Sequence, residues 1–242
     1  MYKLQSRTHQ RTCVVLAGGL GLRIRTLTNG LVPKVLVPVN GVPFLEHKLR
    51  SLAEMGITDA LILTGELGDQ VELFVSRHRF SGLHVSCLPD GPTLLGTGGA
   101  IARATPSLPN QFWITYGDSL MTTDLAAAES RLTSLQLDAV MTVYKNESDI
   151  EPSNVVVSGD LVTEYSKRNH TGQANWIDLG LLFVSQQAFR GAGAGHPVDL
   201  AEILQPLIVN RRVLAWSEKS RFWDIGTPEA LHATEAWLRS NH

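Results

Sequence analysis

V-V-L-A-G-G-L-G-L-R, residues 14–23, is an apolar run that leads into three glycines and an arginine. The β-branched residues predict a strand, and glycines after a strand let backbone N–H groups approach a polyphosphate without interference from Cβ atoms. Arg23 adds a planar fork for phosphate oxygens, and Lys34, which follows Pro33, adds a compact charge. The segment therefore predicts a phosphate-binding loop, with a tight turn and solvated cations as the alternative.

Two well-known glycine loops do not fit this segment. A P-loop ends in Gly-Lys-Ser/Thr, and no such tripeptide follows Gly21. A dinucleotide-binding loop reads G-x-G-x-x-G, opens into a helix and is followed about 20 residues later by an acidic residue. Here the spacing is G-G-x-G, Pro33 and Pro38 interrupt the expected helix, and position 40 is Asn. Both become minor alternatives.

Short β-rich runs alternate with helical patterns, which predicts an α/β fold whose sheet carries helices on both faces. Strands are expected at residues 12–16, 60–63, 83–88, 111–116 and 139–144, and helices at residues 44–55, 67–78, 99–105 and 124–134. A hairpin at residues 155–165, with its turn at 158–160, and a strand at 177–184 make the sheet mixed. No linker or repeat interrupts the chain, so we expect an N-terminal extension, 1–11, and a single domain, 12–242.

Composition excludes several classes of partner. The chain has 242 residues and a formal net charge of −2, which gives no reason to expect nucleic acid or an anionic membrane as a partner. No run approaches the roughly 20 apolar residues that span a bilayer, and the first twelve residues lack a signal-peptide core. Cys13 and Cys87 lack C-x-x-C spacing and are expected as apolar fillers. We expect a cytoplasmic protein.

Two further motifs have ligand-binding character. In L-G-T-G-G-A, residues 95–100, the glycines leave flat space for a base and Thr97 offers a hydroxyl to its edge, although a surface loop is the alternative. Asp118 follows the strand ending W-I-T-Y, and so lies at the carboxyl edge where open α/β sheets bind ligands. A helix-capping role is the alternative for Asp118.

The string L-A-G-G-L-G-L-R at 16–23, with P-K-V-L-V-P-V at 33–39, resembles the signature of the sugar-1-phosphate nucleotidylyltransferases, L-A-G-G-x-G-T-R and P-K-x-L-x-P-V. Leu22 replaces the usual Thr, and Thr26 stands where a Pro is common. Five motifs occur in the expected order between residues 12 and 237. The chain is most similar to the short, single-domain heptose- and mannose-1-phosphate guanylyltransferases, which implies a three-layer α/β/α, Rossmann-like nucleotidyltransferase fold with a mixed central sheet.

The resemblance also implies roles for individual residues. Catalysis is assigned to Arg23, Lys34 and Asp118. Nucleotide binding is assigned to Leu16, Ala17, Gly18, Gly19, Gly21, Arg23, Lys34, Gly96, Thr97, Gly98 and Gly117. Mg²⁺ is assigned to Asp118 and to Asp224 of F-W-D-I-G-T-P, residues 222–228, in which Thr227 and Pro228 suit the first positions of a helix.

The sugar side matches the family less closely. Lys167 of E-Y-S-K occupies the place of a lysine that meets the sugar phosphate, but Ser166 replaces the acidic residue that usually precedes it. The segment W-I-D-L-G, residues 176–180, is similar to one that contacts sugar hydroxyls. The resemblance thus assigns the sugar phosphate to Gly99, Asn154, Lys167 and Asp178, while an ordinary surface role is the alternative for Asn154 and Asp178.

The implied reaction transfers a nucleoside monophosphate from an NTP to a sugar 1-phosphate, giving an NDP-sugar and pyrophosphate (EC 2.7.7 class). GTP and a heptose or mannose 1-phosphate are the favoured pair, and a homodimer is left open. A catalytically silent nucleotide-binding module is one alternative, because Leu22 and Ser166 depart from the pattern. A sugar-nucleotide-dependent glycosyltransferase is another, although Ser119 and Leu120 follow Asp118 where such enzymes show D-x-D.

Overall fold

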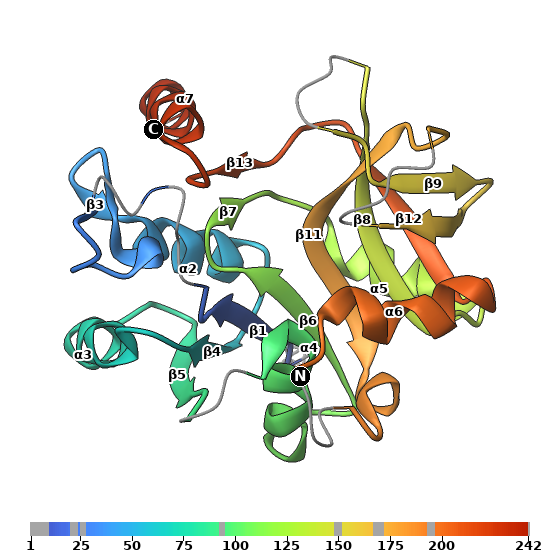
Figure 1. The fold of residues 1–242 in the computed structure, drawn as a ribbon, viewed down its shortest axis with the longest axis horizontal. Helices are drawn as coiled ribbons and strands as arrows, with labels where there is room; N and C mark the ends of the chain where they lie inside the picture. Colours follow the sequence, from blue (N-terminus) through green and yellow to red (C-terminus); the bar gives the residue numbers. More distant parts are fainter. Residues whose placement is uncertain are drawn as a thin grey trace, which may run out of the picture.

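The computed structural model describes residues 10–19, 24, 28–91, 95–147, 152–166, 172–192 and 197–241. A nine-stranded mixed sheet runs through this part of the chain (Figure 1). From one edge to the other its strands are β5 (His84–Pro89), β4 (Asp59–Thr64), β1 (Thr12–Ala17), β6 (Gln111–Tyr116), β11 (Trp176–Ser185), β8 (Ala139–Lys145), β12 (Val213–Glu218), β10 (Leu161–Tyr165) and β9 (Val155–Ser158). Two short ribbons pair β2 (Pro38–Val39) with β3 (Val42–Pro43) and β7 (Ser119–Leu120) with β13 (Trp223–Asp224).

Strand direction places several loops at one edge of the sheet. Strands β5, β4, β1 and β6 are mutually parallel, whereas β11 runs antiparallel to both β6 and β8. Ala17 lies opposite Thr64, and Thr64 lies opposite Pro89, so three strands end in register. The residues that directly follow these strands therefore meet at the carboxyl edge, where open α/β sheets bind their ligands.

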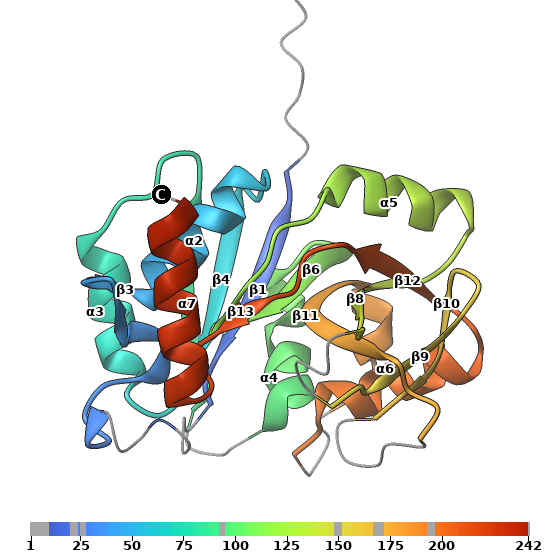
Figure 2. The same ribbon diagram turned by 90° about the horizontal axis from the view of Figure 1, so that it is seen from above.

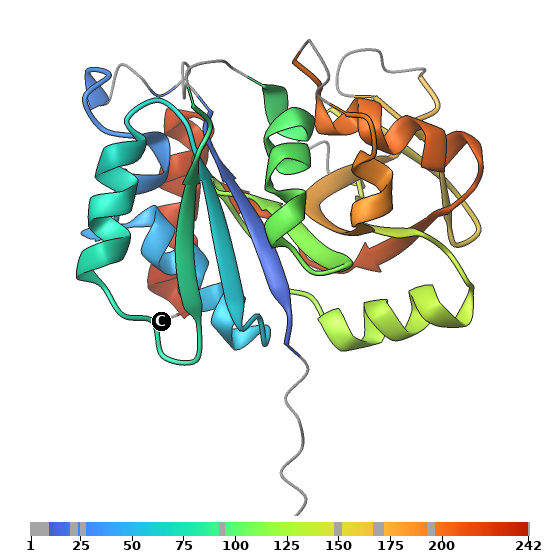
Figure 3. The ribbon, with the colours of Figure 1, turned by 90° about the horizontal axis from the view of Figure 1, so that it is seen from below.

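Helices cover both faces of the sheet, as Figures 2 and 3 show from opposite sides. One core packs α2 (Phe44–Glu54), α3 (Gly68–Arg77) and α5 (Leu125–Ser134) against side chains that include Cys13 and Val15. The other packs α4 (Gly96–Ala104) and α6 (Leu200–Val209) against side chains that include Val14. Successive residues of β1 thus point to opposite cores, which is why the strand is apolar on both faces.

A third, smaller core lies beside the β2–β3 ribbon. Helix α7 (Pro228–Asn241) packs Leu231 and Leu238 there against Val37, Val39 and Phe44. Thr227 accepts a hydrogen bond from the N–H of Ala230, so it caps α7, and Pro228 is the first helical residue, as the sequence predicted. Three 3₁₀ turns complete the described elements: η2 (Lys34–Leu36), η3 (Thr105–Ser107) and η4 (Gln186–Phe189).

The predicted strands and helices are confirmed with boundaries shifted by a few residues, and Gly159 forms the predicted hairpin turn with a φ of 60°. The mixed character of the sheet is also confirmed. Sequence analysis missed β12, α6 and the short ribbons. Cys13 is fully buried as expected, whereas Cys87 is only partly buried, and both are free thiols. The division into an extension and one domain stays a prediction.

None of the helices in the described part of the chain has the length and apolar character that crossing a membrane requires.

Candidate active site

The predicted phosphate loop begins where β1 ends. A Cβ on Gly18 would lie 2.9 Å from Oδ2 of Asp90, and a Cβ on Gly65, which follows β4, would lie 2.7 Å from the Gly18 carbonyl oxygen. Two adjacent strand ends therefore approach each other through backbone alone, which only glycine permits. Gly21, Leu22 and Arg23 lie outside the described residues, so their predicted phosphate contacts stay predictions.

The turn after β6 is tied directly to the end of β1. The N–H of Gly117 donates to the carbonyl oxygen of Leu16 at 2.9 Å. A Cβ on Gly117 would lie 2.9 Å from Cγ1 of Val35 and 3.0 Å from that same carbonyl oxygen. Glycine is thus required at this position by close packing, and the contact places Asp118 next to the phosphate loop.

Lys34 and Asp118, both predicted as catalytic, are in contact. The ammonium of Lys34, at the first residue of η2, donates to Oδ2 of Asp118 at 2.6 Å. The Lys34 side chain is 12% exposed and that of Asp118 is 35% exposed, so the pair faces solvent on the carboxylate side. A short, charge-assisted hydrogen bond of this kind fixes the lysine beside the loop.

The second predicted metal ligand, Asp224, reaches the same place through the β7–β13 ribbon. Asp224 lies opposite Ser119, and the N–H of Ile225 donates to the Asp118 carbonyl oxygen at 3.0 Å. Oδ1 of Asp224 accepts a hydrogen bond from the N–H of Gly226. Two carboxylates that the sequence separates widely are therefore held close together, Asp118 directly before β7 and Asp224 on β13.

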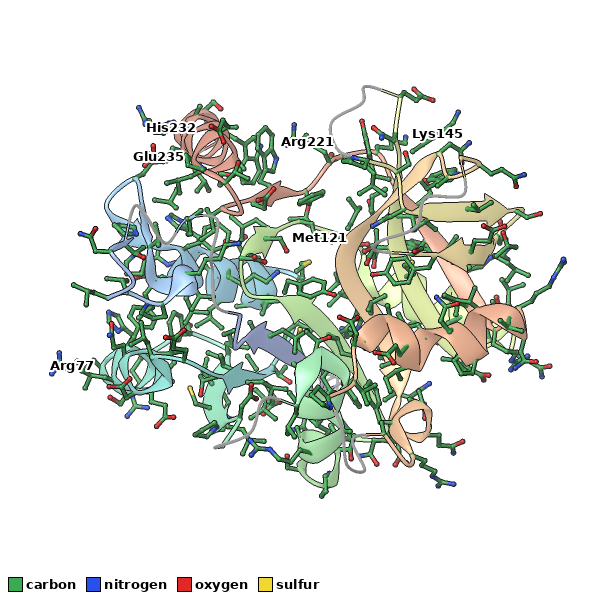
Figure 4. The ribbon with its side chains drawn as sticks, in the orientation of Figure 1. Arg77, Met121, Lys145, Arg221, His232 and Glu235 are labelled. Carbon is green, nitrogen blue, oxygen red and sulfur yellow. The ribbon has the colours of Figure 1, made fainter. Side chains whose placement is uncertain are left out.

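The charge of each of these two carboxylates acts on the other. Burial is the main cause that raises the pKa of Asp224, and the charge of Asp118 raises it further. The Gly226 N–H, Lys34 and Arg221 act in the opposite direction. Arg221 lies on the segment that leads into β13 (Figure 4), with its guanidinium 4.7 Å from the centre of the Trp223 ring.

This donor set fits a magnesium ion. Carboxylate oxygens are the hard ligands that Mg²⁺ prefers, and it commonly binds one or two of them together with phosphate oxygens and water. Among the described residues, no cluster of three or more His, Cys, Asp or Glu side chains is suited to a metal. Asp118 and Asp224 would thus hold the ion only together with substrate phosphate and water.

The second glycine motif packs against the start of α6. The N–H groups of Gly98 and Gly99 donate to the Val198 carbonyl oxygen at 2.8 and 3.2 Å, and a Cβ on Gly96 would lie 2.5 Å from the same oxygen. The Thr97 hydroxyl accepts a hydrogen bond from the N–H of Leu200 at 2.8 Å. The amides of Gly98 and Gly99 are thus engaged within the fold and both residues are buried, whereas Gly96 is exposed and Thr97 is partly buried. Their nucleotide role stays a prediction.

Two of the predicted sugar-side residues lie together. Oδ1 of Asn154 accepts a hydrogen bond from the N–H of Asp178 at 2.9 Å. The Asp178 carboxylate accepts from the Gly180 N–H at 2.8 Å and from the hydroxyl of Tyr165 at 2.9 Å. The N–H of Ser166 donates to the Asn154 carbonyl oxygen at 3.0 Å, but Lys167, next in sequence, lies outside the described residues.

Comparison with known proteins identifies the family. Residues 13–221 match the family described as the MobA-like NTP transferase domain. The chain belongs to this NTP transferase family. It is 29% identical over 227 residues to the N-acetylmuramate alpha-1-phosphate uridylyltransferase of Neisseria meningitidis serogroup B, covering 92% of this chain and 96% of that protein. It is 25% identical over 229 residues to the D-glycero-alpha-D-manno-heptose 1-phosphate guanylyltransferase of Aneurinibacillus thermoaerophilus, covering 93% and 97%.

A solved structure shows the same fold as this NTP transferase. The crystal structure of HddC from Yersinia pseudotuberculosis superposes with a TM-score of 0.80 at 22% identity, covering 95% of this chain and all of the other. The α/β fold is therefore confirmed. Because the relatives include sugar-1-phosphate nucleotidyltransferases, the family predicted from the motifs is confirmed as well.

Three side chains that border or contact the candidate site residues were missed by sequence analysis: Asp90, Tyr165 and Lys48. Asp90 directly follows β5, and its Oδ1 is buried without a hydrogen-bond partner among the described residues. Burial raises the pKa of this carboxyl group, and Arg103 acts against that rise. The position of Asp90 directly after a parallel strand is the feature of the sequence that could have revealed it. Tyr165, which is 5% exposed, orients Asp178, and nothing local in its hairpin reveals that contact.

We predict different outcomes for two glycines at this edge of the sheet. Gly65→Ala should lower the free energy of unfolding by about 1–3 kcal/mol, because its Cβ would lie 2.7 Å from the carbonyl oxygen and 2.8 Å from the Cα of Gly18, which are backbone atoms. Gly19→Ala should change it by less than about 0.5 kcal/mol, because a Cβ there meets nothing within 4 Å. Urea unfolding of both variants measures the difference. Equal losses would contradict the close packing at the end of β1.

Proposed function

We propose that the protein transfers a nucleoside monophosphate from an NTP to a sugar 1-phosphate and releases pyrophosphate. The observation that carries this proposal is the cluster of Lys34, Asp118 and Asp224 beside the glycine loop of β1. In a member of the NTP transferase family, such a cluster is suited to a triphosphate and its counter-ion. The sugar phosphate is supported by the names of the relatives and by the residues around Asp178.

The chemistry is an in-line displacement at the α-phosphorus. An oxygen of the sugar 1-phosphate forms a new bond to this phosphorus as the bond to the pyrophosphate oxygen breaks. No covalent bond to the protein is needed, so the protein contributes alignment and neutralisation of charge. We assign Lys34 and Arg23 to the triphosphate and leaving pyrophosphate, and Lys167 to the attacking phosphate.

We assign Mg²⁺ to Asp118 and Asp224. When bound there, the ion would neutralise negative charge on the phosphate oxygens. Lys34 already balances Asp118 in the structure, and the Gly226 N–H orients Asp224. On the sugar side, Tyr165 and Gly180 fix the orientation of Asp178, which we assign to sugar hydroxyls together with Asn154. Gly99 is proposed to border the sugar phosphate.

Two substrate pairs are supported. GTP with a heptose or mannose 1-phosphate is favoured by the motif resemblance and by guanylyltransferase relatives, including a mannose-1-phosphate guanylyltransferase of Mycobacterium tuberculosis that is 27% identical over 228 residues. UTP with N-acetylmuramate 1-phosphate is the second pair, because the uridylyltransferase relative is 29% identical over nearly the whole chain. We further propose a cytoplasmic location, where nucleoside triphosphates are made and consumed, and we leave a homodimer open.

The decisive experiment measures pyrophosphate release over a panel of nucleoside triphosphates and sugar 1-phosphates. We expect release that needs both substrates and is abolished by EDTA, with GTP giving the highest kcat/KM. A tenfold preference for UTP, equivalent to about 1.4 kcal/mol, would replace the guanine assignment while leaving the reaction class intact. Binding of nucleotide without any turnover would instead support a silent module, and consumption of an NDP-sugar would support a glycosyltransferase.

The carboxylates of Asp118 and Asp224 should both be needed for a wild-type kcat. Asp118→Asn and Asp224→Asn keep the side-chain shape but remove charge, so each should lower kcat by about a hundredfold or more, roughly 2.7 kcal/mol. Asp124→Asn is the matched control, since Asp124 accepts only a capping hydrogen bond from the Ala127 N–H, which Asn also accepts. Steady-state kinetics in excess Mg²⁺ decide the question, and a wild-type kcat in either variant would remove that aspartate from the mechanism.

Substitution of the two lysines that we propose to bind phosphate should have different effects on the affinity for nucleotide. Lys34→Ala should weaken binding of the nucleotide in the absence of sugar phosphate, because it removes a cation beside the loop. Lys167→Ala should leave that binary affinity nearly unchanged and should raise KM for the sugar phosphate. Calorimetric titration of each variant with a non-hydrolysable triphosphate tests this. Equal losses of nucleotide affinity would show that Lys167 is misassigned.

A further inference from the structure

Helix α2 carries a lysine where its apolar face enters the core. Lys48 is 1% exposed, and its neighbours on the same face, Leu45, Leu49 and Leu52, are fully buried. Lysine is almost never fully buried unless it is paired, and its desolvation is costly. A methionine of similar length would fill this place without that cost, so the charge calls for an explanation.

The ammonium of Lys48 holds both ends of the turn that carries Asp118. It donates to Oγ1 of Thr115, near the end of β6, at 2.7 Å and to the carbonyl oxygen of Ser119, at the start of β7, at 2.8 Å. One side chain on a helix thereby bridges residues on either side of Asp118. Neither hydrogen-bond partner is a carboxylate, so the ammonium is not neutralised by its direct contacts.

The groups that act electrostatically on Lys48 include a residue of the candidate site. Burial is the main cause that lowers the pKa of Lys48, to about 8, while Cys13 and, to a smaller extent, Asp118 act against that fall. Burial raises the pKa of the Cys13 thiol to about 12, so this thiol is neutral at ordinary pH. Asp118 is therefore the carboxylate that acts on the Lys48 ammonium.

We propose that Lys48 is a positioning residue, which fixes the turn at residues 115–119 and thereby presents the Asp118 carboxylate to a divalent cation and the triphosphate. The proposal rests on the proposed function, in which Asp118 is a metal ligand. Lys34 binds Asp118 from the side of the phosphate loop, whereas Lys48 acts from beneath, through the backbone and Thr115. Lys34 thus binds the carboxylate of Asp118, whereas Lys48 holds the turn that carries it.

Three variants test this role. Lys48→Met removes the charge and both hydrogen bonds, Thr115→Val removes one bond, and Thr115→Ser keeps the hydroxyl. Leu52→Met is the matched control, because it alters the same buried face of α2 and removes neither a charge nor a hydrogen bond to the turn. For each we would measure Mn²⁺ binding to the substrate-free protein by calorimetry, kcat, KM for both substrates, and Tm.

We expect Lys48→Met to weaken Mn²⁺ binding and to lower kcat by tenfold or more, with KM for the sugar phosphate unchanged. Thr115→Val should show a smaller effect of the same kind, and Thr115→Ser should restore the wild-type values. Leu52→Met should at most lower Tm. If Lys48→Met fails to fold, the two Thr115 variants decide the question alone.

A lowered Tm with unchanged Mn²⁺ affinity and kcat, in Lys48→Met or in Thr115→Val, would overturn the proposal and leave a purely structural lysine. Failure of the proposed function looks different, since wild type would then release no pyrophosphate with any substrate pair. The Mn²⁺ titrations, compared with Asp118→Asn, would still report whether Lys48 positions the carboxylate in that case.

Discussion

The ion pair between Lys34 and Asp118 is the contact on which the site depends, because it joins segments that are 84 residues apart in the sequence. The carboxylates of Asp118, directly before β7, and Asp224, on β13, repel each other, and the charge of Asp118 raises the pKa of Asp224. A cation beside them offsets this repulsion, because an opposite charge nearby stabilises an ionised carboxylate. The lysine is mostly buried, so solvent and salt screen its charge less than they would at the surface.

The strand ends supply the frame for that ion pair. Because β1, β4 and β5 end in register, the residues that follow them meet at one edge, where Gly18 and Gly65 touch through backbone atoms. The Gly117 N–H ties the turn after β6 to the same edge. The position of Asp118 is thus set by sheet geometry and is then secured by Lys34 on one side and by Lys48 on the other.

The sequence predicted the features that a few neighbouring residues determine. The glycine loop after a β-branched strand, the hairpin turn at Gly159 and the cap formed by Thr227 are of this kind. Helix α6 was missed because Pro206 lies inside it, even though Asp199 and Glu202 form a capping box at its start. The pairing of β7 with β13 and the partners of Lys48 depend on contacts between distant residues, which no local pattern encodes.

The second glycine motif is explained by the packing of two helices. A Cβ on Gly96 would meet the Val198 carbonyl oxygen, and a Cβ on Gly98 would lie 3.0 Å from the carbonyl oxygen of Asp199, so close packing of α4 on the start of α6 already requires glycine. That packing joins α4 to α6, the helix that contacts β10. The Thr97 hydroxyl adds to this packing, because it accepts a hydrogen bond from the Leu200 N–H at the start of α6.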